Sequence, residues 1–326
     1  MNWLIGTGPM AKDYVKVLQS LKEEVLVIGR SPESTAAFAS AHNVNAVAGG
    51  VAGFLDTHPA LPAAVIVSVS VEQLAPVTAQ LLQYGVRKLL VEKPGGLDSQ
   101  EIGELAALAK VKNAAVFIAY NRRFYTSTLE ARRLIEADGG VTSFNFEITE
   151  WSHVIANHQK DPRVMERWFT ANTSHVIDMA FHLGGKPKEI CSFHAGSTPW
   201  HPASSNFVGA GVSTNGALFT YYGNWRAPGR WSVEMCTKAH RFIFRPMEEL
   251  QVQNIGSVAV ERVTLDDHLD KEFKPGLFLQ VRNFLSGITD SFCTVHDQIA
   301  NVVMYESFAG YANYSVVAKC GDKNGT

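Results

Sequence analysis

The chain has 326 residues, of which 46% are hydrophobic and 18% are charged, and its formal net charge at pH 7 is −2. This composition is typical of a globular protein of about two domains, and it gives no reason to expect a nucleic-acid or anionic-membrane partner. No apolar run is long enough to span a bilayer, and the first residues lack the pattern of a signal peptide.

Cysteine and histidine spacing argues against several other protein classes. The four cysteines are scattered and show no paired spacing, which predicts reduced thiols in a cytoplasmic protein. These cysteines are Cys191, Cys236, Cys293 and Cys320. The eleven histidines do not cluster with them, so no metal site is expected. A serine hydrolase has little support because the chain has no Gly-x-Ser-x-Gly elbow.

A glycine-rich turn follows the first predicted strand, residues 2–5. Gly6 permits a tight turn, Gly8 lets the backbone approach a pyrophosphate, and Ala11 lets the next helix pack close to the strand. The phosphates of a dinucleotide would meet the N-terminus of that helix. The residues predicted to bind there are Gly6, Gly8, Pro9, Met10 and Ala11. The alternative is an ordinary tight turn.

The second predicted strand, residues 24–28, bears on the choice of cofactor. Proteins that bind NAD usually carry an acidic residue near the end of this strand, which accepts a hydrogen bond from the ribose 2′-hydroxyl. This chain has Arg30 and Ser31 instead, and both could hold a 2′-phosphate. NADP is therefore the expected cofactor and NAD the less favoured one. The alternative is that Arg30 is a solvated surface charge.

Strands and helices alternate regularly as far as residue 120. Four helices are expected from the glycines to about residue 21, from Ser31 to 41, near 51 and from 71 to 84. A fifth is expected to begin at Ser99, which would cap it, and to end at about 110. The expected strands between them lie near 44 and at 63–70, 86–91 and 114–119. This alternation predicts a doubly wound parallel sheet, a Rossmann domain over residues 1–120, with ligands beyond the carboxyl ends of the strands. Residues at those ends are Ser68, Val69, Ser70, Glu92 and Lys93, assigned to the cofactor, and Tyr120, assigned to the substrate.

The second half, residues 121–326, is predicted to be an α+β domain with a large, mostly antiparallel sheet. A first helix is expected over 127–137, followed by strands over 142–149, 189–194, 203–212, 217–225, 231–236 and 240–245. Two closing helices are expected over 278–285 and 295–314, and they are able to pack back on the first domain. An open, aromatic face of this sheet would suit a dimer contact, the alternative being a face covered by helices of the domain. The aromatic residues in question are Phe219, Tyr221, Tyr222, Trp225 and Trp231.

Several motifs in this order resemble those of the glucose–fructose oxidoreductase, inositol dehydrogenase and MocA-like family. Besides the glycine turn, they are Glu92-Lys93-Pro94, Asn121-Arg122-Arg123-Phe124, Ser174-His175-Val-Ile-Asp178 and Gly184-Gly-Lys-Pro187. The resemblance covers essentially the whole length. It implies a nucleotide-binding domain, a second domain whose sheet forms a homodimer or homotetramer, and activity on sugars, cyclitols or their derivatives.

The resemblance also implies roles for individual residues. Lys93 corresponds to the family lysine that contacts the substrate hydroxyl and the cofactor, where an ammonium stabilises a developing alkoxide. The peptide bond before Pro94 is expected to be cis. His175 corresponds to the family's proton acceptor or donor, a task that suits histidine, and Asp178 corresponds to a carboxylate that binds substrate or orients this histidine. The alternatives are a solvated Lys93 and a packing His175.

The chain departs from the family pattern at one position. Many members carry an aspartate four residues before the histidine, where this chain has Ala171, followed by Asn172. Three interpretations remain. His175 works with Lys93 alone, Asp178 and His182 supply the pair, or the protein is a specialised or weakened member; the first is preferred.

A polar and aromatic segment lies upstream of the histidine. Trp151 or Trp168 could stack on a sugar ring while His153 and Asn157 read its hydroxyls; the alternative is a loop packed on the core. Arg123, beside Arg122, could bind an anionic substituent, although a surface ion pair is an equal alternative. The residues predicted to bind substrate are Tyr120, Arg123, Trp151, His153, Trp168, Asn172 and Asp178.

Together these features predict an NADP-dependent oxidoreductase that transfers hydride between nicotinamide and a carbinol or carbonyl carbon of a sugar, cyclitol, sugar acid or nucleotide-linked sugar. Two alternatives are a reductase of a C=N or C=C bond, which the missing aspartate allows, and a cofactor-binding regulator without turnover.

Overall fold

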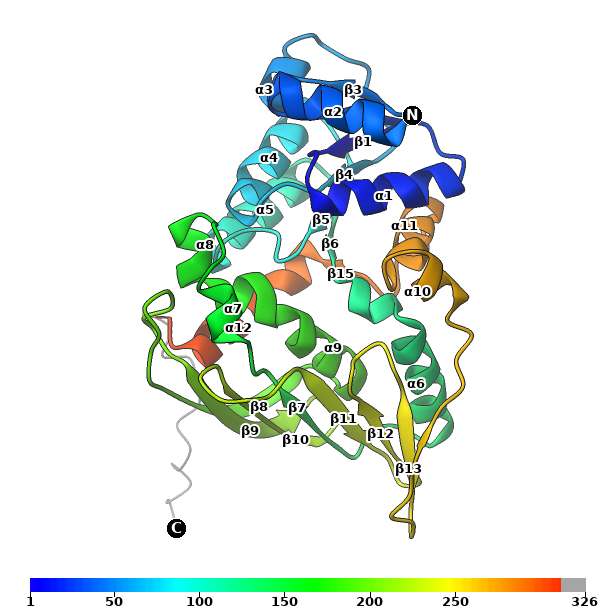
Figure 1. Cartoon of the computed structure of the whole chain (residues 1–326), viewed down its shortest axis with the longest axis vertical. Helices are drawn as coiled ribbons and strands as arrows, with labels where there is room; N and C mark the ends of the chain where they lie inside the picture. The colour runs from blue at the N-terminus through cyan, green and yellow to red at the C-terminus, as the bar shows by residue number, and fades with distance from the viewer. Residues whose placement is uncertain (312–326) are drawn as a thin grey trace. The chain divides into compact units, whose positions relative to one another are not determined.

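The computed structural model describes residues 1–311, which form two compact units (Figure 1). Unit 1 consists of Met1–Phe124 and His268–Val302. Within the described residues, unit 2 consists of Tyr125–Asp267 and the segment from Val303 onward. The expected helix end at Tyr314 and the thiol of Cys320 lie outside the described residues, and helix α12, Val295–Ala309, is the last element seen.

Unit 1 contains the predicted parallel sheet. Its strands lie in the order β15-β6-β5-β4-β1-β2-β3, and the neighbours among β1 to β6 are all parallel. The strands are β1 Asn2–Ile5, β2 Val25–Ile28, β3 Asn45–Val47, β4 Val65–Val67, β5 Lys88–Glu92, β6 Ala115–Ala119 and β15 Cys293–Thr294. Strand β4 is shorter than predicted. Strand β15 was not predicted, because two residues at an antiparallel edge carry no periodic pattern.

Helices cover the sheet of unit 1. They are α1 Pro9–Ser20, α2 Pro32–His42, α3 Gly50–Leu55, α4 Val71–Tyr84, α5 Ser99–Val111, the 3₁₀ turn η1 Asn121–Phe124, α10 His268–Glu272 and α11 Leu277–Ser286. Asp98, and not Ser99 as predicted, caps α5, since its side chain accepts from the backbone N–H of Glu101. A short aspartate before the first helical residue satisfies the same free N–H groups that a serine would.

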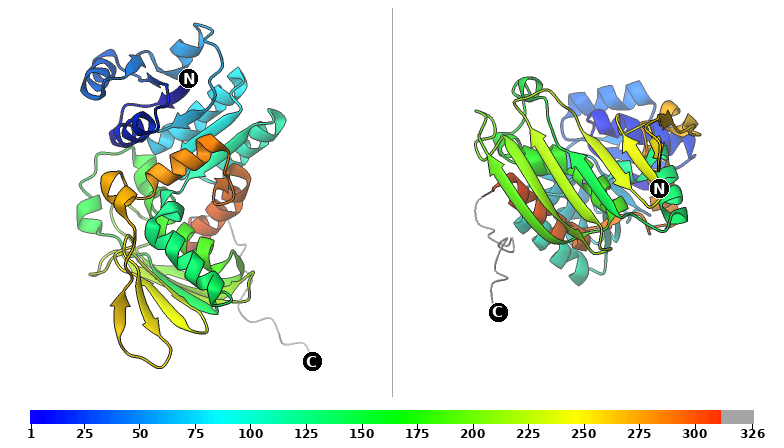
Figure 2. Two further views of the ribbon diagram at one scale, coloured as in Figure 1. Left: turned by 90° about the vertical axis from the view of Figure 1, so that its right-hand side faces the viewer. Right: turned by 90° about the horizontal axis from the view of Figure 1, so that it is seen from below.

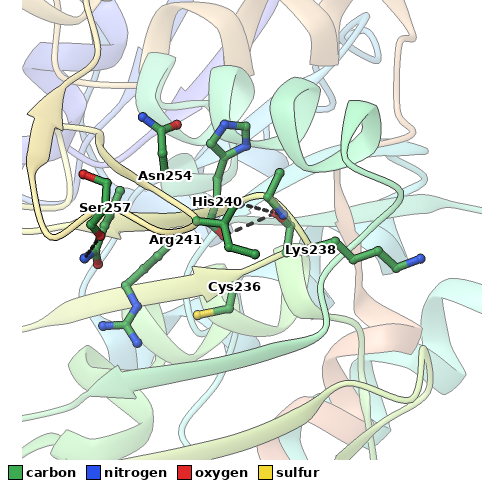
Figure 3. Close-up of a pocket in the computed structure, with 10 residues that line it drawn as sticks. Cys236, Lys238, His240, Arg241, Asn254 and Ser257 are labelled. Atoms are coloured by element: carbon green, nitrogen blue, oxygen red, sulfur yellow. Dashed lines mark hydrogen bonds between the residues drawn. The ribbon is translucent and has the colours of Figure 1, made fainter.

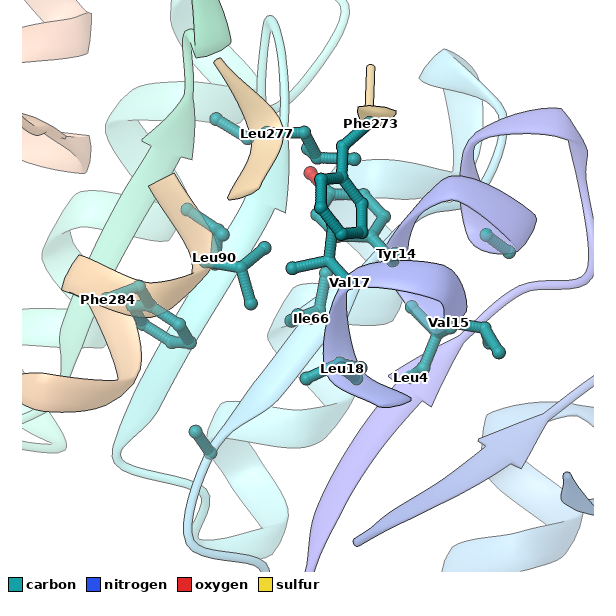
Figure 4. Packing of buried hydrophobic residues seen from close by; sticks show 14 of the residues in the cluster. Leu4, Tyr14, Val15, Val17, Leu18, Ile66, Leu90, Phe273, Leu277 and Phe284 are labelled. Atoms are coloured by element: carbon teal, nitrogen blue, oxygen red, sulfur yellow. The ribbon is translucent and has the colours of Figure 1, made fainter. Parts of the chain in front are cut away.

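The core of unit 1 joins distant parts of the chain. Leu4 on β1 and Tyr14 on α1 share one buried cluster with Leu277 and Phe284 on α11 (Figure 4). Helix α11 contacts α1 and thereby covers part of the same face of the sheet.

Unit 2 is built on the predicted large, mostly antiparallel sheet, with the strand order β14-β13-β12-β11-β7-β10-β9-β8 and one parallel pair, β7 with β10. The strands are β7 Ser143–Glu147, β8 Pro187–Ala195, β9 Asn206–Ser213, β10 Leu218–Asn224, β11 Ser232–Cys236, β12 His240–Phe244, β13 Gln251–Asn254 and β14 Val260–Arg262. The helices are α6 Thr126–Ala137, α7 Ser152–Ile155, α8 Pro162–Glu166, the π-helix η2 Phe169–Thr173 and α9 Ser174–Gly184.

The aromatic side chains of this sheet mostly point inward, contrary to the prediction of an aromatic open face. Phe219 packs on Phe181 of α9, and Tyr221 stacks on Phe308 of α12. Trp225 and Trp231 are buried as well, and of the five aromatic residues only Tyr222 is exposed. One face of the sheet therefore carries the core, and no helix of residues 1–311 lies in front of the other face (Figure 2, right).

Candidate active site

The glycine turn lies where the strand order of unit 1 reverses. Strands β1 and β4 are neighbours, and the chain leaves them towards opposite sides of the sheet, which is where open α/β sheets bind ligands. Gly6 follows β1 with φ of +112°, and a Cβ atom at this position would lie 2.2 Å from the carbonyl oxygen of Ser68 after β4. Only glycine permits this approach of the two strand ends.

Gly8 lies at the start of helix α1 and leaves space above the backbone. A Cβ atom built on it would meet nothing within 4 Å. Gly8 is the N-cap of α1, no side chain caps the helix, and the first turn, which begins with Pro9 and Met10, holds no acidic residue. Ala11 is fully buried, so the helix packs closely. The turn therefore fits a pyrophosphate, which the free N–H groups of the helix would bind.

Beyond β2, the two residues assigned to the ribose end of the cofactor differ in their surroundings. Ser31 caps helix α2, and its hydroxyl oxygen accepts from the backbone N–H of Ser34 at 3.3 Å. Arg30 is exposed. The cap occupies part of the bonding capacity of Ser31, which leaves the Arg30 guanidinium as the main group able to bind a 2′-phosphate.

Lys93 follows β5, at the same carboxyl edge of the sheet as Gly6 and Ser68. The Lys93–Pro94 peptide bond is cis, as expected. The preceding Glu92 accepts a hydrogen bond of 2.6 Å from the Tyr14 hydroxyl. Burial raises the pKa of Glu92, and the bond from Tyr14 and the charge of Lys93 partly offset this effect.

A buried glutamine that sequence reasoning missed supports this turn. Gln298 of α12 is fully buried, and its amide donates to the carbonyl oxygen of Pro94 at 3.0 Å and to the hydroxyl of Tyr120 at 2.8 Å. Its carbonyl oxygen accepts from Asn301 at 3.2 Å. Nothing in the sequence signals this role, because the glutamine lies far along the chain from the turn that it contacts.

Three other residues assigned to the cofactor follow β4, which lies between β1 with its glycine turn and β5 with Lys93. Ser68 is buried after β4, and Val69 leads from it to Ser70, which is the N-cap of α4. The Ser70 hydroxyl donates to the carboxylate of Glu72. Arg123, which was assigned to the substrate, lies in the 3₁₀ turn η1 after β6, and its guanidinium donates to the carbonyl oxygen of Ser291 at 3.2 Å.

In unit 2, a π-helix leads directly into the helix that carries the predicted histidine. Ala171 and Asn172 lie on η2, and His175 and Asp178 lie on α9. Asp178 is 3% exposed, and the ring centroid of His175 lies 6.2 Å from that of Trp231. Short π-helical segments are rare and often occur at functional sites.

Glu150, which was not predicted as a site residue, is hydrogen-bonded to the end of this π-helix. It is 2% exposed and accepts from the Asn172 amide and the Thr173 hydroxyl, each at 2.8 Å. Its other oxygen lies 3.4 Å from the guanidinium of Arg230. Burial raises the pKa of Glu150, and these donors oppose the rise. The sequence offered one signal for a site role of Glu150, since this carboxylate directly follows a predicted strand and precedes Trp151.

A second buried network holds the start of η2. The Nδ1 atom of His201 lies 2.7 Å from the carbonyl oxygen of Ser204 and therefore donates to it. The Nε2 atom then accepts from the Tyr311 hydroxyl at 2.7 Å, and that hydroxyl in turn accepts from the backbone N–H of Phe169 at 3.2 Å. The network needs His201 in its neutral form.

This network predicts acid sensitivity. Burial lowers the pKa of His201 from 6.5 to about 4, so the unfolded chain binds a proton more readily than the folded chain. The free energy of unfolding should fall by about 3 kcal/mol from this group as the pH drops from about 6.5 to 4. Denaturant unfolding across this range measures it, and His201→Gln should show a shallower pH dependence. An unchanged slope in that variant would contradict the assignment.

The predicted substrate tryptophans occupy different environments. Trp168 is buried and stacks on His158 with ring centroids 5.6 Å apart. Trp151 is 48% exposed. Trp151, His153 and the buried Glu150 line one cavity of about 1200 Å³. Trp168 is thus part of the packing behind the cavity.

A smaller cavity of about 320 Å³ lies at the turn between β11 and β12, lined by residues such as Cys236, Lys238, His240, Arg241 and Asn254 (Figure 3). The Nδ1 atom of His240 donates to the carboxylate of Asp138 at 2.8 Å. None of the predicted site residues lines this cavity.

Two negative findings concern the described part of the chain. Across residues 1–311, no group of three or more His, Cys, Asp or Glu side chains is placed to hold a metal ion. Among these same residues no helix combines the length and apolarity needed to cross a bilayer.

Residues 3–120 match the model of the GFO_IDH_MocA oxidoreductase family, which describes its NAD-binding Rossmann fold. These residues are therefore similar to the NAD-binding domain of that family. The match confirms the predicted family and enzyme class, an oxidoreductase with an NAD-binding domain. Curated protein sequences gave no match.

Several solved structures share the fold of nearly the whole chain. A levoglucosan dehydrogenase in complex with NADH and L-sorbose is 17% identical, with a TM-score of 0.77 over 94% of this chain and 95% of that one. An oxidoreductase from Agrobacterium radiobacter in complex with NAD⁺, L-tartaric acid and magnesium is 12% identical, with a TM-score of 0.77 over 96% of each chain. A UDP-N-acetylglucosamine 3-dehydrogenase from Acidithiobacillus ferrooxidans is 16% identical, with a TM-score of 0.71 over 94% and 96%.

Proposed function

We propose that this oxidoreductase is an NADP-dependent dehydrogenase or reductase of a sugar, cyclitol, sugar acid or nucleotide-linked sugar. The observation that carries the proposal is the position of Lys93, at the same edge of the parallel sheet as the glycine turn of Gly6 and Gly8. A cation there lies on the side where a dinucleotide binds. The similar structures of enzymes named for levoglucosan and for UDP-N-acetylglucosamine support a sugar-like substrate.

The proposed chemistry divides between the cofactor and two side chains. The nicotinamide would supply or accept the hydride. During oxidation of a carbinol, the Lys93 ammonium stabilises the negative charge that develops on the carbinol oxygen. The His175 imidazole accepts the hydroxyl proton, and in the reverse direction it returns that proton. Asp178, on the same face of α9 as His175, orients the imidazole or binds a substrate hydroxyl.

The proposal keeps the substrate residues that were assigned from the sequence. In unit 2 Trp151 and His153 line a large cavity, and the Asn172 amide, held by Glu150, presents its carbonyl oxygen as an acceptor. In unit 1 Tyr120 is fixed by Gln298, and Arg123 is proposed to bind an anionic substituent.

The cofactor preference depends on Arg30. Thermal unfolding should show stabilisation by NADPH greater than by NADH; a ligand at 100 times its Kd contributes about 2.7 kcal/mol. In Arg30→Ala the Kd for NADPH should rise by roughly 10- to 100-fold, because charge-assisted bonds to the 2′-phosphate are lost, while the Kd for NADH stays unchanged. Arg87→Ala is the control, since Arg87 is an exposed arginine next to the opposite end of β5. Stabilisation by NADH alone would overturn the NADP assignment and leave the enzyme class intact.

We also propose a cytoplasmic homodimer or homotetramer assembled through the uncovered face of the unit 2 sheet. That face presents Phe193, Val208, Leu218 and Tyr222, which are 50–64% exposed. The cysteines are scattered along the sequence without paired spacing, which supports the cytoplasmic location.

A second candidate function is reduction of a C=N or C=C bond. It is favoured by the buried Ala171, which supplies no proton acceptor at the position where the family usually has an aspartate. Reduced-cofactor oxidation with imine or enoate substrates, in the absence of sugar turnover, would favour this candidate.

A further inference from the structure

We propose that the cavity beside Glu150 binds a second sugar ring, so that the preferred substrate is a neutral glycoside larger than one ring. The cavity, called here the tryptophan pocket, is lined by Glu150, Trp151, His153, Trp200, Trp225 and Arg226, among others. This inference rests on the proposed sugar-oxidising function and names its substrate class.

The aromatic walls of the tryptophan pocket are rigid. Trp200 and Trp225 stack with ring centroids 5.4 Å apart and an interplanar angle of 7°. The indole N–H of Trp200 donates to the Ser152 hydroxyl at 3.0 Å. The indole N–H of Trp151 donates to the Gly229 carbonyl oxygen at 2.9 Å. Flat apolar faces held in place offer stacking area to a pyranose ring with little loss of side-chain entropy.

The polar side of the tryptophan pocket is a buried acceptor. Two of the hydrogen bonds to Glu150, from Asn172 and Thr173, go to the same oxygen, Oε1. Arg230 donates to the other oxygen, Oε2, at 3.4 Å. A carboxylate has about four acceptor positions, so Glu150 retains about one position to accept from a ligand hydroxyl. His153 and Arg226 are exposed in the same cavity and supply donors. Aromatic faces combined with a few fixed polar groups suit carbohydrate recognition.

Size and charge define the ligand class further. The volume of about 1200 Å³ exceeds the roughly 300–1,000 Å³ of pockets that hold drug-sized ligands, so one ring would leave most of it unfilled. The lining carries one carboxylate, Glu150, and one arginine, Arg226, so their charges offset each other and give a diphosphate no net attraction. A neutral second ring therefore fits better than a nucleotide diphosphate.

The test measures binding by calorimetry to the full chain loaded with NADP⁺. The probes are D-glucose, D-galactose, cellobiose, maltose, lactose and UDP-glucose. At least one disaccharide should bind about tenfold more tightly than its monosaccharide, and Trp151→Ala should remove this advantage by weakening the binding of the disaccharide far more than that of the monosaccharide. Trp151→Phe should retain most of it. Val154→Ala is the matched control, because Val154 is exposed on the same short helix and does not line the pocket.

Each other outcome has a definite meaning. Four outcomes would each overturn the inference. In the first, disaccharides bind no more tightly than monosaccharides, and in the second, the disaccharide advantage survives both Trp151→Ala and Glu150→Gln. In the third, UDP-glucose binds most tightly, and in the fourth, no probe binds. Turnover of the same sugars with NADP⁺ is measured in parallel. If the sugars are turned over but disaccharides bind no more tightly, only the inference about the second ring is wrong. If a Trp151-dependent disaccharide advantage is found without turnover, the proposed oxidation is wrong and the sugar-binding role of the tryptophan pocket stands.

Discussion

Replacement of Lys93 by alanine is expected to lower kcat/KM by about 100- to 1,000-fold without loss of the thermal stabilisation by NADPH. The ammonium acts on charge that develops only in the transition state, so its removal affects turnover more than cofactor binding. Initial rates with the best sugar substrate and thermal unfolding with NADPH measure the two effects separately.

A lysine elsewhere in unit 1 provides the control for this experiment. Lys110 is exposed in the last turn of α5, and Lys110→Ala should behave as the unchanged protein. Turnover of Lys93→Ala within threefold of the unchanged protein would rule out the role given to Lys93. If the unchanged protein binds NADPH and turns over none of the candidate substrates, the alternative of a cofactor-binding regulator gains support.

Replacement of His175 by alanine should lower kcat by about 100- to 10,000-fold. It should also remove the limb of the pH–rate profile that reports the proton acceptor, which a merely structural role would not do. His182→Ala, on the same helix α9, tests the interpretation in which Asp178 and His182 form the working pair. The proposal predicts that His182→Ala lowers kcat only slightly. A larger loss of kcat in His182→Ala than in His175→Ala would reverse the assignment.

The parallel sheet of unit 1 was predictable because burial on both faces leaves a simple trace in the sequence. Strands such as β4 and β5 are apolar runs, and the helix between them has bounds that match the prediction, with Gly85 at its C-terminal end. The cis bond at Pro94 was also expected, from the family resemblance. These features depend on neighbouring residues in the sequence.

Features that depend on distant residues were not predictable in the same way. The burial of Phe219 and Tyr221 depends on α9 and α12, which cover that face of the sheet. The bonds of Gln298 to Pro94 and Tyr120, and those of Asn172 and Thr173 to Glu150, likewise join segments far apart in the chain. Alternation along a strand shows that it has two different faces, and it does not show what covers each face.

The discontinuity of unit 1 has a consequence for synthesis of the protein. Its nucleotide-binding turn is complete within the first residues, but Leu277, Val281 and Phe284 of α11 belong to the same buried cluster as Leu4 and Tyr14. A nascent chain that has emerged from the ribosome only as far as unit 2 therefore carries an uncovered apolar surface on α1. The core of the cofactor-binding unit is closed only after most of the chain has been translated.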